Sequence, residues 1–259
     1  MLHRRARARR ARRARTLRML ALAPALAGLL AALSQGSVAL ALYVRENPEL
    51  YLRTVRVEGL RRLNELDIVR QAGVTMNDHI LLVDTTAIAR RLLENPYIRS
   101  CEVGRVFPDM LTIRIQERLP EATLLSNNRA FVIDRDGVVL RELQMYEPHR
   151  GPLITEVPGL DVIEVGDRIE QPELRRAMEV LDAFEKTEIA QHVTIAEVAA
   201  RDERDIRMYC DELTFEIRWG GSDLPRQAAR LDVLWRHQNG RMEFTQYCDL
   251  RFGREVACR

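Results

Sequence analysis

The residues best suited to catalysis are scattered along this chain of 259 residues. Its histidines show no metal-ligand spacing to one another, and they lie at His3, His79, His149, His192 and His237. HExxH, GxSxG, Walker-loop and GxGxxG signatures are absent from the sequence. Residues 134–137 (DRDG) with Glu142 resemble part of a calcium loop, but a hairpin turn explains them better because the third acidic position is missing. We therefore expect a protein that is not an enzyme and needs no cofactor or metal.

Cysteine chemistry is the second candidate. The chain has four cysteines, Cys101, Cys210, Cys248 and Cys258, and no CxxC pair, so redox and zinc sites are poorly supported. Strand alternation aligns Cys210 with Ile206 and Met208, and Cys248 with Leu250. We expect buried free thiols that serve as small core side chains. An oxidising compartment would permit one of six possible disulfides.

The best candidate for a binding function is a terminal strand predicted at residues 243–252. Alternation points one set of side chains inward, namely Phe244, Gln246, Cys248, Leu250 and Phe252, and another outward, namely Thr245, Tyr247, Asp249 and Arg251. A terminal strand has a free edge, whose N–H and C=O groups can accept a partner segment.

Tyr and Arg are favoured at protein interfaces, so we expect side-chain contacts from Tyr247, Arg251 and Arg254. A solvated sheet face is the alternative interpretation. The candidate partner-binding residues of this region are Tyr247, Asp249, Arg251, Phe252 and Arg254, with Arg226 and Arg230 on the preceding predicted helix.

An apolar segment near the start predicts a membrane anchor. Residues 19–44 contain no formal charge, and about 20 helical residues cross a hydrocarbon core. Nine arginines and no acidic residue precede Met19, which predicts a cytoplasmic N-terminus and export of everything after Val44. A signal peptide cleaved near residues 39–41 is the alternative, although this stretch is longer than a usual apolar core of such peptides. The remaining residues carry a mildly acidic net charge, which argues against a nucleic-acid partner.

The elements after the anchor form two groups. The first group has the order β-α-α-β-β, with strands predicted at 53–58, 98–107 and 110–118 and helices at 64–72 and 85–95. Leu66 and Val69 mark the apolar face of its first helix, and Leu111, Ile113 and Ile115 share one face of its last strand.

The second group consists mainly of strands. It begins with a hairpin at 129–134 and 138–143, followed by a helix at 173–186 and strands at 193–199, 205–210 and 213–219. A second amphipathic helix at 223–238 and the strand at 243–252 follow. The first of these helices has an apolar face formed by Leu174, Ala177, Met178, Leu181 and Phe184.

This order resembles the FtsQ/DivIB family of the bacterial divisome. The similarity rests on VRVEGLRRLNELDIVRQAGV at 55–74, the segment 81–122 with its aromatic-Pro turn, AFVIDRDGVVL at 130–140 and YCDLRFGREVACR at 247–259. The resemblance implies an α+β protein with a basic cytoplasmic tail at 1–18, a single transmembrane helix at 19–44 and a connector at 45–51. A POTRA domain at 52–119 and an FtsQ-type β domain at 120–259 would follow. The four cysteines depart from the family pattern.

The resemblance also implies a function. It predicts a non-enzymatic scaffold of the inner membrane at the division septum, with periplasmic domains that bind FtsL-like and FtsB-like proteins and other divisome components. Such a scaffold would couple early and late steps of septum assembly. In the POTRA domain, the first helix and second strand are the implied contact regions, which gives Arg70, Arg99 and Glu102 as candidates. A POTRA module of an export or outer-membrane assembly system and an anchored cell-wall enzyme are the alternatives.

Overall fold

The computed structural model describes Tyr43 and residues 45–144, 146–149, 151–242, 244–253 and 255–259. The predicted basic tail and, apart from Tyr43, the predicted anchor at 19–44 lie outside the described residues. Among the residues that are described, no helix is both long and apolar enough to cross a bilayer.

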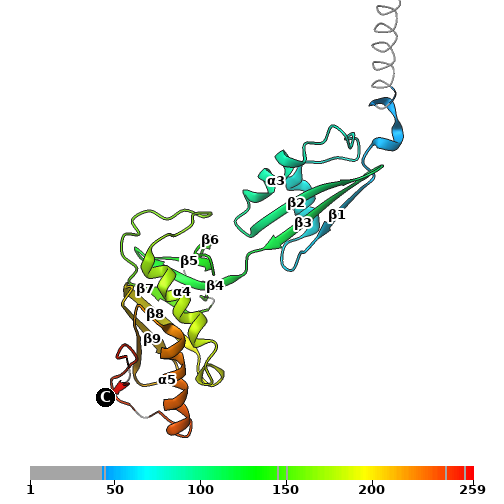
Figure 1. Ribbon diagram of the computed structural model, residues 1–259. Coiled ribbons are helices and arrows are strands. Elements are labelled where there is room, and N and C mark those ends of the chain that lie inside the picture. Colours follow the sequence, from blue (N-terminus) through cyan, green and yellow to red (C-terminus); the bar gives the residue numbers. More distant parts are fainter. Residues whose placement is uncertain (1–42, 44, 145, 150, 243, 254) are drawn as a thin grey trace, which may run out of the picture. The chain divides into compact units, whose positions relative to one another are not determined.

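The first group of elements follows the predicted order. A short 3-10 helix, η1, precedes three strands and two α-helices: η1 (Pro48–Leu50), β1 (Thr54–Glu58), α2 (Glu65–Ala72), α3 (Thr85–Leu93), β2 (Ile98–Val106) and β3 (Met110–Glu117). The strands form one sheet in the order β1-β3-β2 (Figure 1). Leu111, Ile113 and Ile115 of the central strand are buried, as the alternation predicts.

The prediction for the apolar face of α2 is wrong at Leu66, whose exposed fraction is 71%. Ile68 and Ala72 are the buried residues of this helix. They stand four positions apart and so share one helix face, whereas Leu66 lies on a different face. The prediction missed this face because it paired Leu66 with Val69, three positions apart, and so followed a different side of the helix.

The second group forms a mixed sheet of nine strands. In chain order the strands are β4 (Pro120–Ser126), β5 (Arg129–Asp134), β6 (Val139–Glu142), β7 (Leu153–Thr155), β8 (Ile195–Asp202), β9 (Asp205–Cys210), β10 (Glu216–Trp219), β11 (Tyr247–Asp249) and β12 (Ala257–Cys258). Their order in the sheet is β12-β11-β10-β9-β8-β7-β4-β5-β6. Three pairs are parallel, β4–β7, β7–β8 and β10–β11.

The predicted hairpin around residues 134–137 is confirmed as the β5–β6 connection. A carboxylate oxygen of Asp134 accepts hydrogen bonds from the backbone N–H groups of Asp136 and Val138. This carboxylate therefore stabilises the turn itself. Strands β4, β7 and β12 were not predicted from the sequence.

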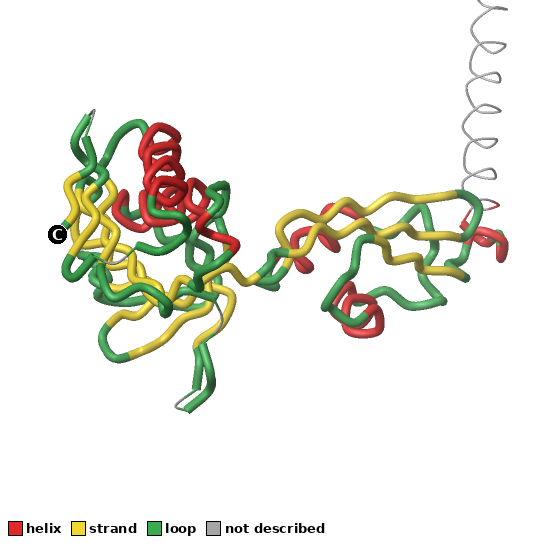
Figure 2. Tube along the Cα trace, turned by 90° about the horizontal axis from the view of Figure 1, so that it is seen from below, coloured by secondary structure: helices red, strands yellow, loops and turns green. Residues whose placement is uncertain are grey.

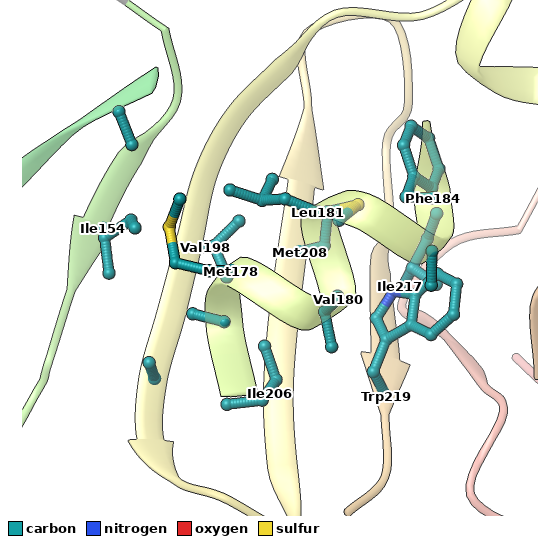
Figure 3. Close-up of a cluster of buried hydrophobic side chains, with 14 of the residues drawn as sticks. Ile154, Met178, Val180, Leu181, Phe184, Val198, Ile206, Met208, Ile217 and Trp219 are labelled. Carbon is teal, nitrogen blue, oxygen red and sulfur yellow. The ribbon is translucent and has the colours of Figure 1, made fainter. Parts of the chain in front are cut away.

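Two amphipathic helices lie side by side over one face of this sheet. They are α4 (Pro172–Phe184) and α5 (Leu224–His237), and Figure 2 shows them in red on the same side of the strands. The apolar residues predicted for the first helix are all buried. Figure 3 shows Met178, Leu181 and Phe184 packed among side chains of β8, β9 and β10. The opposite face of the strands is therefore the one available for polar residues.

The chain divides into two compact units. Of the described residues, the first unit comprises those of 43–56, 73–85 and 103–113, and the second comprises those of 57–72, 86–102 and 114–259. This division passes through the three-stranded sheet, so the domain boundaries at 51/52 and 119/120 stay predictions.

The strand predicted at 243–252 is much shorter in the structure. Only Tyr247–Asp249 form β11, and the two residues of β12 pair antiparallel with it. The expected free edge of the terminal strand is therefore covered by residues close behind it. Gln246 is exposed and Phe252 has an exposed fraction of 53%, although both were predicted to face inward. Both lie outside the regular strand, where alternation no longer determines which side chains are buried.

Candidate partner-binding surface

The outer face of β9, β10 and β11 gathers polar and aromatic side chains. Register pairs Glu216 of β10 with Tyr247 of β11, and Arg218 with Asp249. The residues between them, Ile217 and Cys248, are buried in the core beneath the helices. Alternation therefore places Tyr247 and Asp249 on the face that α4 and α5 leave uncovered, as predicted.

Tyr247 is held by a chain of contacts that crosses three strands. The guanidinium carbon of Arg218 lies 4.4 Å from the centre of the Tyr247 ring, which is a cation–π contact. Arg218 also forms an ion pair with Glu216, and the Tyr209 hydroxyl donates to Glu216 at 2.7 Å. Burial and the hydrogen bond to Glu216 raise the pKa of Tyr209 to about 12. Arg218 thus orients the half-buried Tyr247 ring. Glu216, which accepts a hydrogen bond from the neutral Tyr209, in turn holds Arg218.

Asp249 and Arg251 form the second polar group on this face. The Nε and Nη2 atoms of Arg251 donate to the carboxylate of Asp249 at 2.9 and 2.6 Å. A third nitrogen, Nη1, lies 3.1 Å from the carboxylate of Asp205. The side chain of Arg251 is 32% exposed and that of Asp249 only 3%. The prediction that Asp249 is an exposed contact residue is therefore wrong, because the guanidinium of Arg251 covers it.

The ionisation of Asp249 is coupled to this pair. Burial by itself would raise the pKa of Asp249, but the hydrogen bonds and charge of Arg251, with the charge of Arg218, lower that pKa below its ordinary value. The hydrogen bond to Asp249 in turn raises the pKa of Arg251. Both groups are therefore charged at neutral pH. The guanidinium of Arg251 is mostly engaged by carboxylates of this protein and has little capacity left for a partner.

We expect Asp249→Asn to lower the free energy of unfolding by about 2 kcal/mol at neutral pH, because Arg251 loses its charged acceptor. A carboxylate whose pKa is lowered by folding stabilises the protein above its unfolded pKa of about 3.9. That contribution is lost as the pH falls through the lower folded pKa. Urea unfolding of the whole chain in detergent, from pH 7 down to about 3, should show the two proteins converging at acid pH.

The matched control for this substitution is Asp211→Asn, since Asp211 is exposed near the end of β9. It should change the free energy of unfolding by less than about 0.5 kcal/mol at every pH. A difference between Asp249→Asn and the unchanged protein that stays constant down to pH 3 would contradict the role given to the ion pair.

Arg230 and Arg226 of α5 have different roles in the structure. The guanidinium of Arg230 donates to the backbone oxygens of Leu250 and Gly253, so it fixes the segment that follows β11. Arg226 has an exposed fraction of 79% for its side chain and pairs with Asp223 at 3.2 Å. Arg230 is therefore a positioning residue, and Arg226 stays a candidate contact.

Phe252 and the edge strand complete the surface. Phe252 is the next residue after Arg251 in the chain, and its exposed fraction is 53%. Strand β12 is the last in the order of the sheet, so its outer edge pairs with no other strand among the residues that are described. Arg254, the remaining predicted contact, lies outside the described residues.

Comparison with known sequences identifies the family. The family model described as "POTRA domain, FtsQ-type" matches residues 50–118, and the one described as "Cell division protein FtsQ/DivIB, C-terminal" matches residues 122–251. The chain belongs to the FtsQ/DivIB family of cell division proteins.

Individual FtsQ proteins agree with this assignment. The cell division protein FtsQ of Syntrophotalea carbinolica is 25% identical over 202 residues, which cover 78% of this chain and 71% of that protein. The FtsQ protein of Anaeromyxobacter sp. is 31% identical over 182 residues, covering 70% of this chain and 61% of its own length. The FtsQ protein of a Geobacter species is 25% identical over 230 residues, or 89% and 83% of the two chains.

The POTRA residues of this FtsQ/DivIB chain form a separate set of candidates. Arg99 and Glu102 are exposed on β2, which is an edge strand of its sheet, as expected for a contact surface. Arg70 lies on α2, and its side chain is 81% exposed beside Asp67. These three residues stay predicted contacts.

Sequence reasoning missed Tyr209, Glu216 and Arg218 as part of the FtsQ/DivIB surface. The alternation in 213–219 did place Glu216 and Arg218 on a polar face. It could not show that Tyr247 lies against them, because β10 and β11 are parallel strands joined through the whole of α5. Among the described residues, no group of three or more His, Cys, Asp or Glu side chains could hold a metal ion.

Proposed function

We propose that this FtsQ/DivIB chain is a non-enzymatic scaffold of the division apparatus in the inner membrane. Residues 19–44 serve as its single anchor, with the N-terminus in the cytoplasm and residues 45–259 in the periplasm. The chain binds FtsL-like and FtsB-like division proteins and couples early to late steps of septum assembly. Family membership supports the role in division, and the charge pattern around the apolar segment supports the orientation.

The observation that best supports the location of the binding site is the polar outer face at the β10–β11–β12 end of the second sheet. It combines Tyr247, which Arg218 orients, with the exposed ring of Phe252 and the outer edge of β12. An extended partner segment can add to such an edge through backbone hydrogen bonds while aromatic side chains provide specificity. Central aromatic residues commonly contribute most of the affinity at interfaces. This end of the sheet is therefore our proposed site for the FtsB-like partner.

We expect Tyr247→Ala and Phe252→Ala each to weaken binding of the FtsL-like and FtsB-like pair at least tenfold, which corresponds to about 1.4 kcal/mol. The measurement is a titration of the full chain in detergent with the purified partner pair from the same cell. Phe252 is mostly exposed, so its removal should leave the melting temperature unchanged. It therefore separates lost contact from lost folding.

Tyr146→Ala is the matched control, because Tyr146 is 95% exposed in the connection after β6. It should bind as tightly as the unchanged chain. Equal affinities for all four proteins would show that the partner binds elsewhere. A truncation before Tyr247 is a poorer test, because it removes Cys248 and Leu250 from the core.

The two alternatives named from the sequence have no such support. The match at 122–251 is to the C-terminal part of FtsQ/DivIB proteins, which does not favour an export or outer-membrane assembly module. An anchored cell-wall enzyme would need a catalytic constellation, and the geometry of the described residues favours none.

A further inference from the structure

Two of the four cysteines meet at the end of the nine-stranded sheet. Cys248 of β11 and Cys258 of β12 are directly opposite each other in the antiparallel register. Their sulfur atoms lie 3.5 Å apart, while Cys101 and Cys210 have no neighbouring sulfur among the described contacts. Of the six pairings that the sequence leaves open, the fold brings this one together.

The backbone around the pair is suited to a covalent link. Tyr247 and Arg259 exchange both of their backbone hydrogen bonds, so Cys248 and Cys258 occupy the adjacent non-hydrogen-bonded position of the ladder. Opposite residues at such positions have Cα atoms about 4.5 Å apart, which lies within the range that disulfides span. Side-chain rotation without backbone movement can therefore close the remaining gap between the sulfur atoms.

We propose that Cys248 and Cys258 form a disulfide that fastens β12 to β11 at the edge of the sheet. This proposal rests on the proposed periplasmic location, because disulfides persist in oxidising compartments. Cys258 lies beyond residue 251, the last residue that the FtsQ/DivIB C-terminal model matches. The link is therefore assigned to this chain and not to the family.

The reaction is thiol–disulfide exchange with a donor disulfide, either a small molecule or a disulfide-bearing protein. Cys258 is half-buried and Cys248 fully buried, so Cys258 reacts first. Its thiolate, after losing a proton to water, attacks one donor sulfur and releases one donor thiolate. The Cys248 thiolate then attacks the Cys258 sulfur and releases the second. The two cysteines lose two electrons and two protons, and the donor disulfide is reduced to two thiols.

Burial raises the pKa of both thiols, so little thiolate is present at neutral pH and exchange at this pair is slow. The link closes a short loop that contains Arg251, Phe252 and Gly253. Oxidation therefore constrains the exposed residues of the proposed partner surface as well as the edge strand. A partner segment that adds to this sheet meets β12 as a fixed edge, because β12 cannot leave β11 to make room.

The test uses the full chain in detergent, equilibrated with excess glutathione disulfide, quenched with N-ethylmaleimide and digested with trypsin without reduction. Cleavage after Arg241, Arg251 and Arg254 gives peptides 242–251 and 255–259. We expect these two peptides to be joined, with a mass about 2 Da below their sum and no maleimide on either. Maleimide on both Cys248 and Cys258, or joining of either one to a different cysteine, would overturn the proposal.

Cys258→Ser should abolish the joined peptides, and the matched change Cys210→Ser should leave them intact. Hydrogen exchange provides a second readout. The amide of Arg259 donates to Tyr247 at 3.0 Å, and its exchange should slow on oxidation by up to roughly a hundredfold. Exchange that is unchanged by oxidation would show that the link does not fasten β12. The experiment contains no partner, so its outcome is independent of the binding test on Tyr247.

Discussion

Trp219→Ala should lower the free energy of unfolding by about 3–5 kcal/mol, the largest loss that we expect from truncating one side chain. Trp219 lies on β10 and is fully buried. Its ring meets that of Phe184 edge to face, with centroids 6.4 Å apart, beneath α4 (Figure 3). Removing the indole leaves a cavity between the sheet and the helix that close-packed neighbours cannot fill. Urea unfolding followed by far-ultraviolet circular dichroism measures the effect without relying on tryptophan fluorescence.

Trp219→Phe is the matched variant. The indole Nε1 is buried and has no hydrogen-bond acceptor among the described residues. Phenylalanine keeps most of the apolar volume and removes this unsatisfied donor, which is itself costly to bury. We expect the phenylalanine variant to lose less than half of what the alanine variant loses. Equal losses, or a loss under 1 kcal/mol for alanine, would show that the ring does not support this core.

The second large effect is expected at Gly151, in the connection that leads into β7. A Cβ atom at Gly151 would lie 2.1 Å from the backbone oxygen of Glu121, and its φ of +66° is in the left-handed region. Gly159 has a similar φ of +70°, but a Cβ there would meet nothing within 4 Å. Alanine at either position lowers the free energy of unfolding by about 1–2 kcal/mol, because its side chain disfavours the left-handed backbone. Only Gly151→Ala must also push β4 away.

We therefore expect Gly151→Ala to be at least about 2 kcal/mol more destabilising than Gly159→Ala. The same urea titration on both variants measures this difference. The cost of the left-handed backbone is common to both variants and therefore cancels. The expectation also allows complete loss of the fold in Gly151→Ala, provided that Gly159→Ala stays folded and is only about 1–2 kcal/mol less stable than the unchanged protein. Equal stability of the two variants would mean that β4 and the Gly151 turn are not as close as the structure has them.

The elements predicted well are those that repeat a local pattern over several turns or residues. The helices at 173–186 and 223–238 appear as α4 and α5, because their apolar residues recur at helical spacing along one face. The strands at 205–210 and 213–219 were recognised from strict alternation, and Ile206, Met208 and Ile217 are fully buried. These assignments need only the sequence within one element.

The elements predicted poorly depend on partners that are distant in the sequence. β7 has three residues and β12 only two, so neither contains enough sequence to show a period. The alternation at 243–252 continues past the point where hydrogen bonding to β10 stops, which is why Phe252 was assigned to the core. Asp249 was assigned to solvent because no local pattern could show that Arg251 folds back over it.

The same limit applies to the candidate surface. Sequence alone placed Tyr247 on the uncovered face of its strand, but the residues that orient Tyr247 come from β9 and β10. The proximity of Cys248 and Cys258 likewise follows from a two-residue strand that only the fold reveals. The chemistry of single residues was therefore more predictable than their neighbours.

The parallel pairing of β10 with β11 has a consequence for the order in which the protein is made. Parallel neighbours need a crossover, and here α5 supplies it between residue 219 and residue 247. Synthesis runs from the N-terminus, so β11 and β12 are the last strands of the sheet to emerge. Until they do, β10 is an uncovered edge and Tyr247 has not reached Arg218. A nascent chain can therefore reach the membrane before its proposed binding surface exists, and only chains extended through β12 become competent to recruit a partner.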